Sequence, residues 1–124
     1  MDRIDLHVEV PNLPVEDLLR APAGESTSAI RNRCMGARSR ALARQGKANQ
    51  ALVGQEIDLH AALDESCTQF LRAAASRLGW SARGTHRSLK IARTIADLAQ
   101  SEMIALAHVA EAMQYRHSTL IASA

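Results

Sequence analysis

An amphipathic helical repeat from Ser81 to Ala99 is the feature that most constrains how this chain can fold. At about 100° per residue, its apolar residues gather on one side of a helix and its basic residues on the other. The apolar side consists of Leu89, Ile91, Ala92, Ile95, Ala96, Leu98 and Ala99, and the basic sector consists of Arg83, His86, Arg87, Lys90 and Arg93. The only acid in the run is Asp97, near its far end. The repeat therefore predicts a helix that buries one face against other elements.

The start of this helix is marked by residues that favour helix ends. Ser81 is the expected N-cap, because its hydroxyl can accept a backbone N–H of the first turn, and Gly79 is expected to end the preceding helix. Arg83 then falls in the first turn, where a guanidinium on a rigid element can reach phosphate oxygens in a facing cleft. This layout is typical of a lid that senses a nucleotide. The alternative is that the basic sector is an ordinary solvated face.

Three further main helices are expected from spacing and caps. One is capped by Ser26 or Thr27 and runs to about Gln45, before Gly46; one follows Asp64 and runs to Leu78; the last covers residues 105–115. The apolar stripe of the first is Ile30, Cys34, Ala37 and Ala41, and that of the second is Cys67, Phe70, Leu71, Ala74, Ala75 and Leu78. A short helix over residues 54–60 is expected to make contacts through Ile57 and Leu59. Four main helices with short links predict a small all-α bundle.

The two ends of the chain do not follow this helical pattern. Residues 4–10 alternate apolar and polar side chains, which is typical of a half-buried strand, but no second strand is expected to pair with it. We therefore expect residues 1–22 to be the remnant of a preceding core domain, with no stable place in the fold of this chain. Residues 23–116 form the helical domain, and residues 117–124, which lack a pattern, are expected to be a flexible tail.

Composition narrows the function classes. The 124 residues suffice for one domain, and no signal segment or membrane-length apolar run is present, so a cytoplasmic protein is expected. Cys34 and Cys67 lie in helical patterns and are predicted to be small buried residues without a disulfide. The five histidines show no spacing typical of a zinc site, so we expect surface or capping roles for them and no bound metal.

A second basic segment, residues 31–47, contains six cations and no acid. Such a run is consistent with a solvated helix face or with contacts to phosphate groups, including those of DNA. The six residues are Arg31, Arg33, Arg38, Arg40, Arg44 and Lys47.

Six segments occur in an order and at separations that resemble a known family. They are DRIDLHVEVP at 2–11, GES at 24–26, ARQG at 43–46, LGWSAR at 78–83, IARTIADL at 91–98 and HVAEAMQYR at 108–116. They look like the C-terminal part of the magnesium-chelatase-like AAA+ ATPases, and most of all like their bacterial ComM, or competence protein, subfamily.

The resemblance implies a helical lid that follows an ATPase core binding ATP and Mg²⁺. Arg83 matches the sensor-2 arginine, which would reach the γ-phosphate in its own subunit. Arg3 matches an arginine finger that would reach the site of a neighbouring subunit in a homo-oligomeric ring. Members of the ComM subfamily are associated with branch migration of DNA during natural transformation, so the longer parent protein is expected to be a DNA-processing motor.

The chain departs from the family's full pattern because it has no Gly-x-x-x-x-Gly-Lys-Ser/Thr loop and no Walker-B acids. It is therefore expected not to hydrolyse ATP by itself. Two other interpretations are open. The helix after Asp64 and the Arg83 helix could form a stand-alone helix-turn-helix module that binds DNA. A pure oligomerisation module would instead show an exposed apolar stripe on the helix that ends at Gln45.

Overall fold

The computed structural model describes Leu6, Val8 and residues 24–123, with side chains up to Tyr115. Arg3 lies outside the described residues, as do the expected strand over residues 4–10 and the expected core remnant over residues 1–22, apart from Leu6 and Val8.

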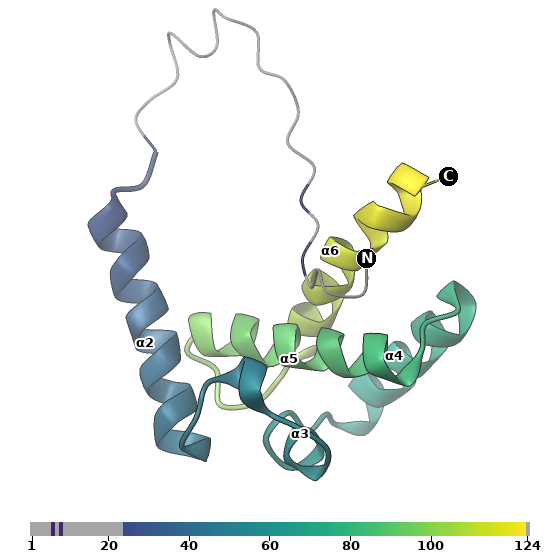
Figure 1. Ribbon diagram of the computed structural model, residues 1–124, viewed down its shortest axis with the longest axis horizontal. Helices are drawn as coiled ribbons and strands as arrows, with labels where there is room; N and C mark the ends of the chain where they lie inside the picture. The colour runs from purple at the N-terminus through teal and green to yellow at the C-terminus, as the bar shows by residue number, and fades with distance from the viewer. Residues whose placement is uncertain (1–5, 7, 9–23, 124) are drawn as a thin grey trace, which may run out of the picture.

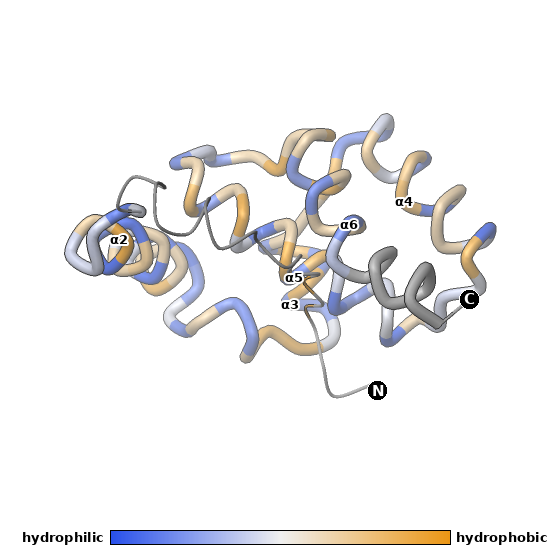
Figure 2. The backbone as a smooth tube through the Cα atoms, turned by 90° about the horizontal axis from the view of Figure 1, so that it is seen from above, coloured by the Kyte–Doolittle hydropathy of each residue, from blue (hydrophilic) through white to orange (hydrophobic). Residues whose placement is uncertain are grey.

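The described chain is a helical bundle, which confirms the all-α prediction. Its elements are α2 (Thr27–Gln45), the short 3₁₀ helix η1 (Asn49–Ala51), α3 (Gln55–His60), α4 (Glu65–Leu78), α5 (Ala82–Leu98) and α6 (Leu106–Ser123), and no strand occurs among the described residues. Figure 1 shows α5 crossing the middle of the molecule, with α2 at one end and α4 at the other. The view from above in Figure 2 again places α2 at one end, with the other helices gathered around α5.

The helix ends follow the capping residues predicted from the sequence. Ser26, Asp64 and Ser81 each accept a hydrogen bond from the backbone N–H three residues on, at 2.8 to 3.1 Å. Gly46 and Gly79 end α2 and α4 in the left-handed region, with φ of 77° and 69°. These local signals act within a few residues, which is why the sequence was enough to place them.

Helix α6 is longer than the sequence pattern predicted. It continues to Ser123 rather than ending near Tyr115, so part of the expected tail is helical. No glycine or proline occurs after Ile104, and a helix that has already formed propagates through such residues without an apolar repeat. The connector between α2 and α3 is also more ordered than predicted, because η1 lies within it.

The core lies between α5 and the elements that surround it. Its buried members are Leu52, Ile57, Ala61, Cys67, Leu71, Ala92, Ala96, Ile104, Val109 and Ala112. Helix α5 packs most extensively on α6 and next on α2. Four small residues at every fourth position of α5 are buried and let the neighbouring helices approach closely: Gly84, Ser88, Ala92 and Ala96.

Several residues predicted to be buried are exposed instead. Ile30 and Cys34 continue the stripe of Ala37 and Ala41, but only the latter two are buried, because the first half of α2 projects beyond the other helices (Figure 1). Leu59 is 73% exposed although Ile57 is buried. Side chains two positions apart on a helix point in nearly opposite directions, so Ile57 and Leu59 could not both face the core.

Three more residues differ from the predicted burial. Phe70 on α4 and Leu98 on α5 are 39% and 40% exposed, and Ala99, just after α5, is exposed as well. Phe70 and Leu98 lie at the edge of the apolar side of their helices, and Ala99 lies beyond the end of α5. Cys67 is buried as predicted, and burial raises the pKa of its thiol.

Candidate functional site

An open cleft of about 940 Å³ runs along one side of α5. Its lining combines most of the predicted basic sector with apolar residues such as Ile57, Ile91 and Ile95. The segment containing η1 and the start of α3 also lines the cleft, as do Leu6 and Tyr115. The α5 residues that line it are Arg83, His86, Arg87, Lys90, Ile91, Thr94, Ile95 and Leu98. A cleft with this lining favours a ligand that has both negative charge and apolar surface.

Arg83 lies at the end of the cleft where α5 begins. Ser81 caps the helix through the N–H of Gly84 at 3.1 Å, which fixes the first turn and places Arg83 within it. The Arg83 side chain is exposed, and it has no hydrogen-bond or ion-pair partner among the described residues. The backbone N–H groups of a helix N-terminus add positive potential at the same place. This end of the cleft therefore offers unused donors to an anion.

Lys90 lies further along α5 and also lines the cleft. Its Nζ donates to the backbone carbonyl of Gln50 at 3.0 Å and so joins α5 to η1 across the cleft. The ammonium has two further protons, so this contact leaves it able to donate to a ligand as well.

Arg93, predicted to lie in the basic sector, is instead 3% exposed. Its Nη1 donates to the carbonyl of Glu102 at 2.9 Å, and its Nη2 donates to the carbonyl of Ser101 at 2.8 Å and to Asp97 at 3.1 Å. The prediction was wrong because the loop after α5 folds back and offers two carbonyl groups to the guanidinium. Arg93 therefore fixes the connection between α5 and α6 and takes no part in the cleft.

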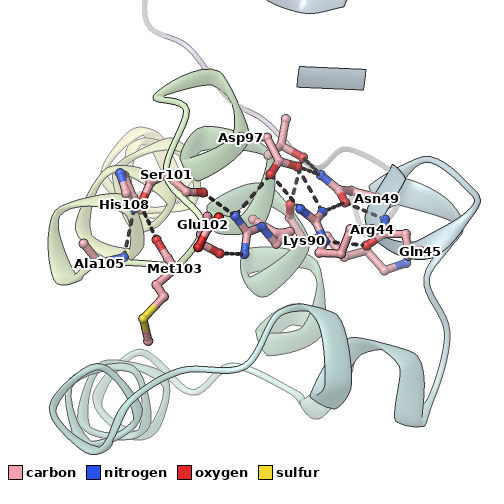
Figure 3. A network of polar contacts seen from close by, with 12 residues as sticks. Arg44, Gln45, Asn49, Lys90, Asp97, Ser101, Glu102, Met103, Ala105 and His108 are labelled. Atoms are coloured by element: carbon pink, nitrogen blue, oxygen red, sulfur yellow. Dashed lines mark hydrogen bonds and ion pairs between the residues drawn. The ribbon is translucent and has the colours of Figure 1, made fainter. Parts of the chain in front are cut away.

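Asp97 is the centre of a buried polar network that the sequence analysis did not predict (Figure 3). Arg44, from the last turn of α2, donates to both carboxylate oxygens at 2.9 and 3.1 Å. Asn49 of η1 donates through its side-chain Nδ2 to Asp97 Oδ2 at 2.9 Å and to Thr94 at 3.1 Å, and its side-chain Oδ1 accepts from Arg44 at 3.0 Å. Together with Arg93, these contacts tie α2, η1 and α5 to one carboxylate.

The network determines the charge state of Asp97. Burial alone would raise the pKa of its carboxyl, but the hydrogen bonds from Arg44 and Asn49 and the positive charges of Arg93 and Arg44 outweigh it. The pKa is therefore lowered from its usual value, and Asp97 is ionised at neutral pH. A signal for this pairing was present in the sequence, since Asp97 is the only acid in an otherwise basic helix, but its partners come from distant segments.

The basic run on α2 divides into two parts in the structure. Arg31, Arg38 and Arg40 are exposed, as is Arg33, which pairs with Glu25 at 2.7 Å. Arg44 belongs to the buried network, and Lys47 just beyond α2 pairs with Glu56 at 2.6 Å. This hydrogen bond and that from the N–H of Val53 lower the pKa of the Glu56 carboxyl. Of the six cations, only the four between Arg31 and Arg40 are exposed and could contact another molecule.

The described residues contain no group of three or more His, Cys, Asp or Glu side chains placed to hold a metal ion. His108 has a capping role, because its Nδ1 accepts the backbone N–H of Ala105 at 2.9 Å near the start of α6. Within the same residues, no helix has the length and apolar character needed to cross a membrane.

The fold and the cleft define a small all-α domain whose central helix presents cations along an open cleft. Residues 24–116 match the family described as magnesium chelatase, subunit ChlI C-terminal, and the chain belongs to that family. The resemblance found in the sequence is thereby confirmed.

Two relatives show how the chain relates to longer proteins. It is 39% identical over 117 residues to the competence protein ComM of Haemophilus influenzae, and 40% identical over 118 residues to the Escherichia coli protein YifB. Each alignment covers 94% of this chain but 23% of the relative. The chain therefore spans about a quarter of the length of the curated relatives it matches.

Proposed function

We propose that this chain is the helical lid of a magnesium-chelatase-like AAA+ ATPase, and that Arg83 acts as its sensor-2 arginine. In this proposal a core domain binds ATP and Mg²⁺, and Arg83 contacts the γ-phosphate. The observation that carries the proposal is the position of Arg83: a capped first turn holds its side chain at the end of an open cleft, with no partner among the described residues.

The residues at this end of the cleft fit a triphosphate. A guanidinium donates paired N–H groups to phosphate oxygens, and the N-terminus of α5 adds positive potential. His86, Arg87 and Lys90 line the wall beyond Arg83. Bound Mg²⁺ would neutralise charge on the phosphates. Arg83 would orient the terminal phosphate, and this contact would couple the position of α5 to the presence of that phosphate.

The proposal for the complete protein goes further. ComM is described as a competence protein, and we propose that the protein containing this lid is an oligomeric DNA-processing ATPase, such as a branch-migration helicase. In such a ring, Arg3 would act as an arginine finger in the neighbouring subunit's site. Fingers of this kind accelerate phosphoryl transfer by roughly a thousandfold or more.

The 124-residue chain alone is proposed to lack ATPase activity, since its sequence contains no phosphate loop. One charge-assisted contact contributes about 1.5–3 kcal/mol, which is too little for tight binding of a nucleotide. Calorimetry should therefore detect at most weak ATP binding, and micromolar affinity would contradict this part of the proposal.

The geometry argues against a stand-alone helix-turn-helix module. The turn between α4 and α5 has a suitable length, but α5 is the central helix and is packed against α6, α2, η1 and α3. A recognition helix must protrude to enter the major groove, whereas the basic side of α5 lines a cleft.

DNA contact through α2 is a second candidate function, and the exposed Arg31, Arg38 and Arg40 favour it. Such contacts would be independent of sequence and would weaken with salt, with a log–log slope near −0.9 per phosphate neutralised. Replacing Arg31, Arg38 and Arg40 with glutamine in the complete protein should reduce this slope. An unchanged slope would reject the DNA-facing role and leave subunit contacts, for which the exposed Ile30 and Cys34 are also suited.

The principal test is ATP hydrolysis by the complete protein. Arg83→Ala should lower kcat by roughly 10- to 100-fold, which corresponds to the loss of one charged hydrogen-bonding group, and Arg83→Lys should restore only part of the rate. Arg72→Ala is the matched control, because Arg72 is an exposed arginine on α4 outside the cleft. Equal rates for Arg83→Ala and Arg72→Ala would refute the assignment.

A further inference from the structure

The contact between α2 and α5 differs from the other helix contacts in its chemistry. The buried residues that α2 contributes to it are Ala37 and Ala41, both small. The directional contacts between these helices come from Arg44, whose Nη1 and Nη2 donate to the two carboxylate oxygens of Asp97 at 2.9 and 3.1 Å (Figure 3). The α6 side of α5, in contrast, is packed through apolar residues such as Ala92, Val109 and Ala112. The polar network therefore supplies the directional restraint on the angle between α2 and α5.

The distance along α5 makes this angle important. Asp97 and Arg83 are separated by 14 residues, which is about 21 Å along the helix at 1.5 Å per residue. If α5 rotated by only about 10° relative to α2 around the Asp97 end, the first turn of α5 would move by roughly 4 Å relative to α2. A displacement of this size is larger than a hydrogen bond tolerates. A small error at one end of α5 is thus magnified at the other.

We infer that Arg44 and Asp97 are positioning residues for Arg83: their ion pair makes α2 and α5 one rigid unit and so fixes where α5 presents Arg83. The functional part of this inference rests on the proposed role of Arg83, but the rigidity of the unit does not. Asn49 supports the same geometry, because its side-chain Oδ1 accepts from Arg44 and its Nδ2 donates to Asp97.

The choice of variant follows from the burial of the two partners. Asp97→Asn would leave the buried Arg93 without its carboxylate and risks unfolding the domain. Arg44 is better suited, since its side chain is 24% exposed and Asp97 keeps its contacts with Arg93 and Asn49 when Arg44 is replaced. We therefore compare Arg44→Gln with Arg44→Lys, which keeps the charge, and with Val109→Ala, which weakens the apolar core away from the network.

The first measurement tests rigidity in the 124-residue chain and does not involve ATP. One spin label is attached to the native Cys34, which is exposed on α2, and a second to Ala82→Cys at the exposed start of α5; Cys67 is buried. We expect one narrow distance distribution in the parent sequence, a distribution at least twofold broader or shifted in Arg44→Gln, and an intermediate one in Arg44→Lys. Val109→Ala should keep the narrow distribution. An unchanged distribution in Arg44→Gln overturns the inference, as does equal broadening in Val109→Ala.

The second measurement tests the consequence for the complete ATPase. Arg44→Gln should lower kcat about tenfold while KM for ATP stays within about twofold, because a misplaced group affects catalysis more than binding. If Arg44 acts through Arg83, the double variant with Arg83→Ala should be no slower than Arg83→Ala alone. Multiplicative effects would overturn the positioning role. If Arg83→Ala has no effect by itself, the proposed function fails, and the distance measurement still decides whether the ion pair makes α2 and α5 rigid.

Discussion

The two ends of α5 carry arginines in opposite situations. Arg83, in the first turn, is exposed at the cleft and has no partner among the described residues, whereas Arg93, near the other end, is 3% exposed and donates to one carboxylate and two carbonyl groups. An arginine thus has donors without a partner among the described residues at one end of α5 and holds the bundle together near the other. The difference teaches that the arginine proposed to contact a ligand and the arginine that stabilises the bundle are separated along one helix, so activity and stability should respond to different substitutions.

Removal of the buried arginine should have the largest effect on stability. Arg93→Met keeps much of the aliphatic volume but leaves the carbonyl groups of Ser101 and Glu102 unpaired, so the free energy of unfolding should fall by roughly 3–5 kcal/mol. Urea denaturation followed by circular dichroism measures this change. Arg77→Met on the exposed side of α4 is the control. A loss below about 1 kcal/mol would remove the contrast between the two ends.

Acid should weaken the Asp97 end of α5 selectively. The folded-state pKa of Asp97 is lowered, so its stabilising contribution is complete above the unfolded value of about 3.9 and is lost as pH falls through the folded-state pKa. The free energy of unfolding should therefore decrease below about pH 4.

The N-cap Asp64 also has a lowered pKa, through its hydrogen bond with the N–H of Cys67, and must be separated from this effect. The Glu56 carboxyl has a lowered pKa as well, so the test uses the double variant Asp64→Asn/Glu56→Gln, which keeps a good N-cap and removes both titrating groups. Denaturation of this variant between pH 6 and pH 2.5 should still show most of the acid-induced loss. A flat profile would show that the Asp97 network does not depend on charge.

A smaller gain in stability is expected where α5 ends. Gln100 has a φ of 61°, and the N–H of Ser101 bonds back to Ala96 at 2.8 Å, which is the helix termination that normally uses glycine. Gln100→Gly should raise the free energy of unfolding by about 0.5–1 kcal/mol. The control Gln69→Gly, within α4, should lower it by about 1 kcal/mol. Destabilisation by Gln100→Gly would mean that its side chain has a role that the backbone does not explain.

The smallest change in stability is expected at the cleft end. Arg83→Ala should alter the free energy of unfolding by no more than about 0.5 kcal/mol, because the side chain is exposed. Thermal unfolding of the 124-residue chain tests this directly. A loss above about 1 kcal/mol would show that Arg83 supports the fold, and any effect of the same substitution on ATP hydrolysis would then need a different explanation.

Much of the fold could be predicted because its signals are local. The caps at Ser26, Asp64 and Ser81 and the glycines at Gly46 and Gly79 act within one turn, and the structure confirms all five. The position of Arg83 in the first turn of α5 follows from the same signals. Burial was less predictable, as Cys34 and Leu59 show, because a helical repeat gives the side that could be buried but not how far the neighbouring helices extend.

The candidate site was only partly predictable for the same reason. Periodicity placed Arg83, His86, Arg87 and Lys90 on one wall, and all four line the cleft. It also placed Arg93 there, because spacing alone cannot show that the loop after α5 supplies carbonyl groups. Asn49, from a segment predicted to be a plain connector, was missed although it is buried in the network.

The sequence by itself determined where α2, α4 and α5 begin and end, which residues share a helix face, and which family the chain resembles, since these depend on neighbours a few positions apart or on motif order. Only the tertiary structure decided which cations are available to a ligand. Arg44, Asn49 and Asp97 are brought together across separations of 5 and 53 residues. Whether a charged side chain is buried and paired or exposed depends on such distant partners, because their charges and hydrogen bonds must compensate for the loss of water.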